Sequence, residues 1–412
     1  MSRHYDLLET RAPEVREREQ FAKLAGHIAH AKADAPYFAV LLRDVNPAEI
    51  KDRAALAQLP VTRKSALVEL QKANPPLGGL IAVPPGKLAR IFQSPGPTYD
   101  PEGFGTDWWR LARALHAAGF RAGDILHNTF SYHFTPAGVM LESGAHALGC
   151  AVVPAGVGQT EMQVRAIADI RPTGYAGTPS FLKIILEKGR EMGADLSSLK
   201  RALVAGEALP PQLRADISAF GVDLYQCYAT ADLGLIGYES EAKEGFIVDE
   251  GLIVEIVRPG TGDPVAPGEV GEVLATLFSP EYPLIRFATG DLSAVLPAPS
   301  PCGRTNMRLK GWMGRADQTT KVRGMFVHPA QIADVLKHHP NIEKARLVVD
   351  RDSAGKDTMI LRVECAGAPA GLADKIAETI QAVCKLRGEV AFVAPRELPN
   401  DGRVIEDKRK LT

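Results

Sequence analysis

Between residues 88 and 205, short apolar runs alternate with segments of helical periodicity, and this alternation constrains the fold more than any other feature. The apolar runs are four or five residues long, which is the usual length of a buried strand. The expected strands are residues 88–92, 150–154, 174–177 and 201–205, and the expected helices are 107–118, 161–170 and 181–192. Strands that alternate with helices of this length form βαβ units. The sequence therefore predicts an α/β fold on a mostly parallel sheet.

The pattern changes twice in the second half of the chain. After residue 250 strand patterns dominate, with expected strands at 252–257, 271–277 and within 284–296. From about residue 314, expected helices at 329–338 and 372–386 are combined with strands at 344–349, 359–364 and 389–393. We therefore expect a large N-terminal domain over residues 1–316, with parallel and mixed sheets and a β-rich subdomain, and a small α+β C-terminal domain over residues 317–412.

Composition excludes several classes of protein. The 48 lysines and arginines balance 49 aspartates and glutamates, and a net charge of −1 argues against a nucleic-acid partner. The five cysteines form no C-x-x-C pair, so neither a disulfide framework nor a zinc knuckle is indicated. No apolar run approaches the roughly 20 residues of a membrane span, and the charged N-terminus lacks the apolar centre of a signal peptide. We expect a cytoplasmic protein that does not bind membranes.

Several short motifs are weak individually. The loop expected at residues 93–101 is rich in small residues and could cradle a phosphate with its backbone N–H groups, but a proline-rich turn is the simpler interpretation. Thr289-Gly290-Asp291 is also compatible with an ordinary turn. No G-x-G-x-x-G fingerprint follows Gly156, so a dinucleotide fold is not supported.

The order of these motifs is more informative than any one of them. After the 93–101 loop come Ala-Gly-Glu at 205–207, Tyr-Ala-Thr-Ala-Asp at 228–232, Ile-Arg-Phe-Ala-Thr-Gly-Asp at 285–291, Gly-Arg-Ala-Asp at 314–317 and Arg-Gly-Met-Phe-Val-His-Pro-Ala-Gln-Ile at 323–332. This series resembles the adenylate-forming acyl-CoA ligases. Local matches at 158–161, 177–180, 283–286 and 327–332 resemble the phenylacetate–CoA ligase branch in particular. The resemblance extends from about residue 88 to about residue 407.

The resemblance implies a nucleotide site for ATP or AMP. Asp291 is at the position of the acid that accepts both ribose hydroxyls, a role that suits the two oxygens of a carboxylate. Tyr228 is at the position of the ring that stacks on adenine, and Asp232 is at that of the glutamate that holds Mg²⁺. A turn acid and a core tyrosine are the structural alternatives for Asp291 and Tyr228. The other nucleotide-binding residues implied are Ser94, Gly96, Thr98, Ala205, Gly206, Glu207, Ala229, Thr230 and Arg315.

The resemblance also implies sites for coenzyme A and for a carboxylic acid. Asp317 matches a hinge about which the C-terminal domain rotates, and Arg323 and Gly324 match a pair whose glycine lets pantetheine pass close to the backbone. The implied acid pocket includes Tyr132, His133, Phe134, Gly156 and Gln159, and its aromatic run suits a small aromatic acid. A structural role is an equal alternative for His133. A carrier protein as acyl acceptor and a homodimer are compatible with the sequence.

The chain departs from the family pattern where phosphates bind. Asp100 stands where the family has a lysine, and a carboxylate there would repel a triphosphate. Arg403 stands at the position of the catalytic lysine, and arginine differs from lysine in geometry; an exposed tail residue is the alternative. Of the cysteine and histidine residues that hold zinc in some relatives only Cys302 remains, so no zinc is expected.

Three functions follow from these observations. The first is an ATP-dependent acid–thiol ligase that adenylates a small carboxylic acid with Mg-ATP and transfers the acyl group to coenzyme A, with Arg403 and Asp232 as catalytic residues. The second is an acyltransferase that moves an acyl group from coenzyme A to another thiol without ATP. The third is a non-catalytic module that binds a nucleotide or acyl-CoA.

Overall fold

The computed structural model describes residues 3–94, 98–258, 261–316, 318, 320–327, 329–339, 342, 344–353, 355–365, 367–395, 397–398 and 404–409. The chain divides into two compact units, Met1–Met313 and Gly314–Thr412. The second unit begins three residues before the domain start expected at residue 317. No described helix is both long enough and apolar enough to cross a membrane.

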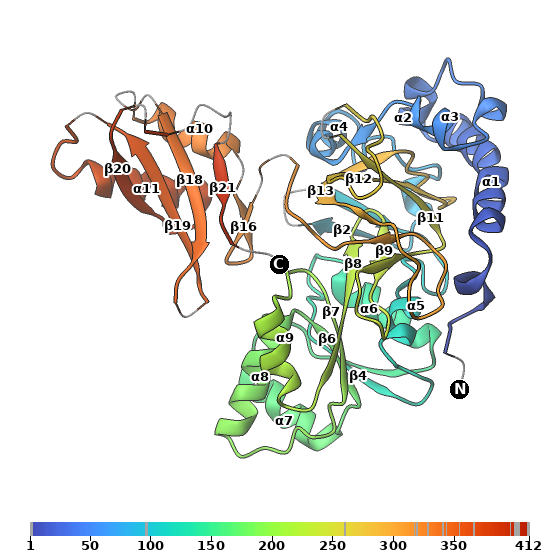
Figure 1. The fold of residues 1–412 in the computed structure, drawn as a ribbon, viewed down its shortest axis with the longest axis horizontal. Coiled ribbons are helices and arrows are strands. Elements are labelled where there is room, and N and C mark those ends of the chain that lie inside the picture. Colours follow the sequence, from blue (N-terminus) through green and yellow to red (C-terminus); the bar gives the residue numbers. More distant parts are fainter. Residues whose placement is uncertain are drawn as a thin grey trace. The chain divides into compact units, whose positions relative to one another are not determined.

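The larger unit is built on a nine-stranded sheet in the order β14-β15-β10-β9-β8-β7-β6-β4-β5. Figure 1 labels β4, β6, β7, β8 and β9 of this sheet. The five strands at one end of that order are parallel to one another: β5 (Ala151–Pro154), β4 (Ile125–Asn128), β6 (Gly174–Gly177), β7 (Arg201–Val204) and β8 (Asp223–Thr230). The others pair antiparallel: β9 (Gly234–Tyr238), β10 (Phe246–Val248), β15 (Arg308–Leu309) and β14 (Val295–Leu296). The predicted α/β class with a largely parallel sheet is confirmed.

Helices connect the parallel strands. They are α6 (Ala137–Ala147), α7 (Thr160–Ile170), α8 (Pro179–Glu191) and α9 (Pro211–Ser218). The predicted helix at 107–118 is wrong at its start, because α5 is Leu111–Ala117. Asp107 and Arg110 have left-handed φ values of 53° and 67°, and Asp107 Oδ2 accepts a hydrogen bond of 3.0 Å from the Ala112 backbone N–H. A polar turn therefore precedes this helix.

A second sheet, in the order β1-β13-β12-β11, forms the β-rich part of the larger unit. Its strands are β1 (Thr62–Arg63), β13 (Phe287–Ser293), β12 (Gly271–Leu277) and β11 (Leu252–Val257). Every residue of β11 and β12 is buried, in part against the N-terminal helix α1 (Pro13–Asp34). The other N-terminal elements are α2 (Pro36–Leu41), α3 (Arg53–Ala57), α4 (Leu67–Ala73) and the short 3-10 segments Leu7–Thr10, Pro47–Glu49, Lys64–Ala66 and Pro85–Lys87.

The loop predicted at residues 93–101 is wrong for most of its length. Strands β2 (Arg90–Ser94) and β3 (Thr98–Glu102) form an antiparallel pair in which Ser94 faces Thr98. The Gln71 side chain of α4 accepts from the Tyr99 backbone N–H at 2.8 Å and donates to its carbonyl at 2.7 Å. These contacts provide hydrogen-bond partners for the Tyr99 backbone N–H and C=O on the side of β3 that faces away from β2. Tyr99 and Asp100 therefore belong to a strand rather than to a flexible loop.

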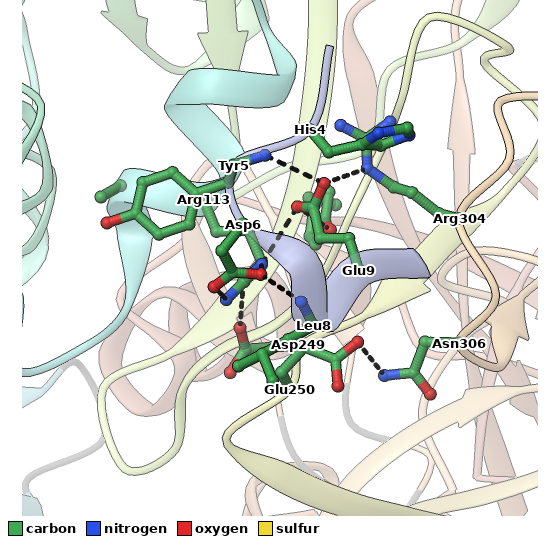
Figure 2. Close-up of polar contacts among 12 residues, drawn as sticks. His4, Tyr5, Asp6, Leu8, Glu9, Arg113, Asp249, Glu250, Arg304 and Asn306 are labelled. Atoms are coloured by element: carbon green, nitrogen blue, oxygen red, sulfur yellow. Dashed lines mark hydrogen bonds and ion pairs between the residues drawn. The ribbon is translucent and has the colours of Figure 1, made fainter. Parts of the chain in front are cut away.

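The chain start is held to the larger unit by buried ion pairs (Figure 2). The Glu9 carboxylate accepts from Arg304 Nε at 2.9 Å and from Arg113 Nη1 at 3.2 Å. The side chains of Glu9 and Arg304 have no exposed surface. The Tyr238 hydroxyl on β9 also donates to Glu9, at 2.8 Å. These contacts connect the first residues of the chain with α5, β9 and the segment that precedes β15.

The smaller unit is an α+β structure, as predicted. Its four-stranded sheet has the order β20-β19-β18-β21, and a separate hairpin pairs β16 with β17. Its strands are β16 (Thr320–Val322), β17 (Met325–Val327), β18 (Lys344–Arg351), β19 (Asp357–Glu364), β20 (Glu389–Val393) and β21 (Ile405–Asp407). Its helices are α10 (Pro329–Lys337) and α11 (Leu372–Cys384), and their apolar residues share one core with the sheet.

Candidate active site

The segments that follow four parallel strands carry many of the predicted site residues. Tyr132 to Phe134 come after β4, Gly156 and Gln159 after β5, and 205–207 after β7. Ser180, from the Gly-Thr-Pro-Ser match, follows β6. Because the carboxyl ends of parallel strands meet at one edge of a sheet, these segments lie at the same edge. This edge is where ligands of open α/β sheets usually bind.

Asp291 lies in the middle of β13, and each of its oxygens has a partner. Oδ2 accepts from the Tyr228 hydroxyl at 2.8 Å, and Oδ1 accepts from Trp312 Nε1 at 3.0 Å. Thr289 Oγ1 lies 3.3 Å from the same tyrosine hydroxyl. The structure thus brings together two residues that the resemblance placed at the ribose and the adenine, and it adds Trp312.

A second group of side chains surrounds Asp232, in the turn between β8 and β9. Lys64 Nζ donates to Asp232 Oδ2 at 2.5 Å. Asp100 lies beside this pair and accepts a hydrogen bond from the Ser94 hydroxyl. Asp232 is fully buried and Asp100 is 1% exposed, whereas the Lys64 side chain is 30% exposed. The lysine therefore lies between two buried carboxyl groups and a more open region.

The charges of this group are strongly coupled. Burial and the neighbouring Asp232 raise the pKa of Asp100 to about 8, although Lys64 opposes the shift. Burial lowers the pKa of Lys64, but attraction to Asp232 and Asp100 outweighs burial and raises that pKa above its ordinary value. The lysine is therefore a cation at neutral pH, and Asp100 holds a proton.

The residues after β6 and β7 contact each other. The Glu207 carboxylate accepts a hydrogen bond of 2.7 Å from the Ser180 backbone N–H. Gly206 and Glu207 are exposed, Ala205 is half-buried, and Gly206 has a left-handed φ of 82°. Of the predicted residues on β8, Ala229 and Thr230 are half-buried, and Thr230 Oγ1 accepts from the Leu233 N–H at 3.1 Å.

The predicted acid-pocket residues occupy two adjacent loops. The His133 and Phe134 rings stack at 4.7 Å between centroids, and both residues are exposed. The Phe134 carbonyl accepts from the Gln93 N–H at 2.9 Å, which ties this loop to the β2–β3 hairpin. The Tyr132 hydroxyl accepts from Asn128 Nδ2 at 2.8 Å, and burial and nearby Glu142 raise the pKa of this tyrosine.

A buried glutamine, Gln163, forms hydrogen bonds with the backbone of the loop that follows β5. Gln163 Nε2 donates to the carbonyls of Gly156 and Gly158 at 2.9 and 3.2 Å. Its Oε1 lies 2.5 Å from Nε2 of His127, which has no exposed surface. Burial lowers the pKa of His127, so this imidazole is neutral. A neutral ring that donates through Nε2 fixes the glutamine amide so that its NH₂ faces the loop.

In the smaller unit, Arg323 and Gly324 form the two-residue turn between β16 and β17. Their φ values are 49° and 83°, as a type I′ hairpin turn requires. Arg323 Nε donates to the Asp357 carbonyl at 3.1 Å. Arg315 is half-buried in the same unit. Three predicted residues, Gly96, Asp317 and Arg403, lie outside the described residues.

The resemblance gives Asp232 a metal role, whereas in this structure its carboxylate is paired with a lysine. Mg²⁺ keeps several water molecules in its coordination sphere, and a fully buried carboxylate offers them no room. A lysine already contacts one of its oxygens, and protonated Asp100 also forms a hydrogen bond with this carboxylate. No group of three or more His, Cys, Asp and Glu residues in the described ranges could hold a metal ion. The expectations about Mg²⁺ and zinc stay untested.

Sequence reasoning missed Lys64, Trp312, Gln163 and His127. Lys64 follows a two-residue strand and carries no motif, so only the parallel pairing of β1 with β13 brings it to the site. His127 and Gln163 were missed because β4 contains polar residues and was not predicted as a strand.

Comparison with known proteins agrees with this geometry. The model of the family described as AMP-binding enzyme matches residues 106–276, and that of the AMP-binding enzyme C-terminal domain matches residues 324–409. The phenylacetate-coenzyme A ligase of Aromatoleum evansii is 32% identical over 363 residues, which cover 84% of this chain and 80% of that protein. The chain belongs to the phenylacetate–CoA ligase branch of the AMP-binding enzymes.

Two further relatives extend the family comparison. The phenylacetate-coenzyme A ligase of Thermus thermophilus is 32% identical over 374 residues, which cover 87% of this chain and 83% of that protein. A solved structure of 2-hydroxyisobutyryl-CoA ligase in complex with 2-HIB-AMP and CoA has a TM-score of 0.83 at 26% identity, and covers 100% of this chain and 93% of that chain. The family predicted from motif order is confirmed, together with its fold.

Proposed function

We propose that this AMP-binding enzyme is an ATP-dependent acid–thiol ligase that converts a small carboxylic acid to its CoA thioester. The observation that carries the proposal is the pairing of Asp291 with Tyr228, at 2.8 Å. It joins the implied ribose acceptor and the implied adenine-stacking ring, and the family's relatives are named as CoA ligases.

The reaction has two steps that share one site. The substrate carboxylate attacks the α-phosphorus of ATP, pyrophosphate leaves, and an acyl adenylate forms. The thiol of coenzyme A then loses its proton and attacks the acyl carbon, and AMP leaves. Both steps develop negative charge on phosphate oxygens, so fixed cationic groups lower the barrier.

Each step has proposed residues in the smaller unit. Arg403 would stabilise charge at the α-phosphate during adenylation, and Arg315 would contact the ribose and phosphate. Arg323 and Gly324 would receive pantetheine, and Asp317 would be the hinge between the two steps. The aromatic residues Tyr132 and Phe134 favour an aromatic acid. A carrier protein as acceptor, Mg²⁺ as the ion that accompanies ATP and a homodimer are further parts of the proposal.

Exchange of labelled pyrophosphate into ATP, measured with a panel of aryl and alkyl acids, tests the proposal. At least one acid should support exchange, and Arg403→Ala should reduce it about 10²–10³-fold, as loss of one charge-stabilising donor typically does. Arg403→Lys should retain the exchange. No exchange with any acid, in wild type and in Arg403→Lys, would replace the ligase with the ATP-independent acyltransferase or the binding module.

A further inference from the structure

Lys64 connects the two groups of candidate site residues in the larger unit. It follows β1 directly, and β1 pairs in parallel with β13 so that Arg63 is opposite Ala288, three residues before Asp291. Asp291 is close enough to contribute to the raised pKa of the lysine. The ammonium group therefore pairs with Asp232 and also interacts electrostatically with the implied ribose acceptor.

The ammonium group retains hydrogen-bonding capacity. Lys64 Nζ carries three N–H donors, and among the described residues its hydrogen-bond acceptor is Asp232 Oδ2. Its side chain is 30% exposed, whereas the side chain of Asp232 has no exposed surface. The remaining donors can reach a ligand that enters from the open side.

The charge balance around Lys64 is compatible with an anion. At neutral pH protonated Asp100 adds no negative charge, so the carboxylates that act on the Lys64 cation are Asp232, which pairs with it, and Asp291. If Asp100 were ionised, the group would carry one more negative charge, which would oppose a phosphate. The proton on Asp100 thus removes the repulsion that its position in the sequence suggested.

We infer that Lys64 binds the 5′-phosphate of the nucleotide and occupies, with its ammonium group, the position beside Asp232 that the resemblance gave to a metal ion. The inference rests on the proposed function, since it assumes an adenosine nucleotide at Asp291. It assigns a phosphate-binding residue that the sequence did not reveal. It also follows that Asp232 acts by positioning Lys64 and that binding of a nucleoside monophosphate does not require Mg²⁺.

Calorimetric titration with AMP and with adenosine tests this assignment in the full chain. Both ligands are titrated with Mg²⁺ and with EDTA, into wild type, Lys64→Met and the matched control Lys183→Met. Lys183 lies on α8, outside the site, and its side chain is 33% exposed. It pairs with Asp216 on α9 at 2.7 Å, so it matches Lys64 as a lysine with one carboxylate partner. Adenosine lacks the phosphate, so it separates a phosphate contact from a general loss of structure.

Wild type should bind AMP more tightly than adenosine, and equally with Mg²⁺ and with EDTA. Lys64→Met should weaken AMP binding about 10- to 100-fold, as expected for a charge-assisted hydrogen bond, and change adenosine binding less than about twofold. Lys64→Arg should restore part of the preference for AMP, and Lys183→Met should match wild type. The restoration distinguishes a phosphate contact from a role confined to folding.

An unchanged preference for AMP in Lys64→Met, or a preference that disappears in EDTA, would overturn the inference. Absence of any AMP or adenosine binding in wild type would overturn both the inference and the nucleotide site. If the preference depends on Lys64 but no acid supports pyrophosphate exchange, the inference holds and the ligase proposal fails.

Discussion

Asp100 is a carboxyl group in a setting that favours its neutral form. Its side chain is 1% exposed, and it forms a hydrogen bond with the neighbouring Asp232 carboxylate. Burial and the charge of Asp232 raise its pKa to about 8. An aspartate in an unfolded chain titrates near 3.9. The folded protein therefore holds a proton on Asp100 over a pH range in which the unfolded chain releases it.

We expect the contribution of Asp100 to the free energy of unfolding to fall as pH rises from about 4 to about 8. The sign follows because the folded state holds the Asp100 proton in this range, and one proton corresponds to at most about 1.4 kcal/mol per pH unit. Asp100→Asn should remove this contribution and change the slope of stability against pH, because the amide does not titrate. Urea unfolding at several pH values measures the effect, and Asp44→Asn, at a 91% exposed side chain, is the control. An unaltered slope in Asp100→Asn would contradict the assignment.

Helix α7 supports a loop of the candidate acid pocket through one side chain. Gln163→Leu would leave the fully buried His127 Nε2 and the half-buried Gly156 carbonyl without their partner, and an unpaired buried polar group costs about 1–3 kcal/mol. We expect a loss of stability of that order and, with the acid identified by pyrophosphate exchange, a higher KM for the acid with a smaller change in kcat. Gln212→Leu makes the same chemical change at an exposed residue of α9 and should affect neither. A normal KM in Gln163→Leu would place the acid elsewhere.

The β16–β17 turn offers a test of the proposed coenzyme A contact. A methyl group at Gly324 meets no atom within 4 Å, so Gly324→Ala adds only the strain of a left-handed backbone, about 1–2 kcal/mol. We expect slower acyl transfer to coenzyme A and pyrophosphate exchange within about twofold of wild type. Gly355→Ala is the matched control, because Gly355 lies in the same unit, has a φ of 80° and has no atom within 4 Å of an added methyl group. If it slows transfer as much as Gly324→Ala, the effect arises from stability alone.

The parts of the fold that the sequence predicts are those set by local pattern. β5, β6, β7, α7 and α8 have apolar periodicity and clear turn residues at their ends, and they appear within a few residues of the expected bounds. β4 was missed because two of its four residues, His127 and Asn128, are polar, so the segment does not form the apolar run that indicates a buried strand, although both are buried. The β2–β3 hairpin was missed because Gln71, distant in sequence, supplies the contacts that make Tyr99 part of a strand.

The candidate site divides in the same way. Asp291 and Tyr228 were found from the order of motifs, although nothing in that order shows that they bond to each other. Lys64 could not be found, because its role depends on a tertiary pairing of two strands more than 200 residues apart in sequence. Asp100 was noticed, but its burial and protonation depend on neighbours that only the fold supplies.

The larger unit contains a nine-stranded sheet, a four-stranded sheet and the β2–β3 hairpin, and the N-terminal segment contacts residues from several of its parts. Glu9 contacts Arg304 and Arg113, and neighbouring Asp6 pairs with Arg113 at 2.7 Å (Figure 2). Farther along, Arg16 donates to Glu250 at 2.9 Å, at the start of the β-rich region. The first turns of the chain are therefore a structural component of the larger unit.

Glu9→Ala should lower the stability of the larger unit by about 1.5–3 kcal/mol, because Arg304 and Arg113 lose a buried, charged hydrogen-bond acceptor while Arg304 keeps Glu241 and Arg113 keeps Asp6 and Asp249. Glu9→Gln retains hydrogen-bond acceptors but not the charge, so its loss should be smaller. Glu69→Ala removes a 78% exposed partner of Lys72 and should change stability by less than about 0.5 kcal/mol. Urea unfolding followed by tryptophan fluorescence reports on this unit, since Trp108, Trp109 and Trp312 all lie in it. A Glu9→Ala variant as stable as the Glu69→Ala control would show that the segment is held by its apolar contacts rather than by the ion pairs.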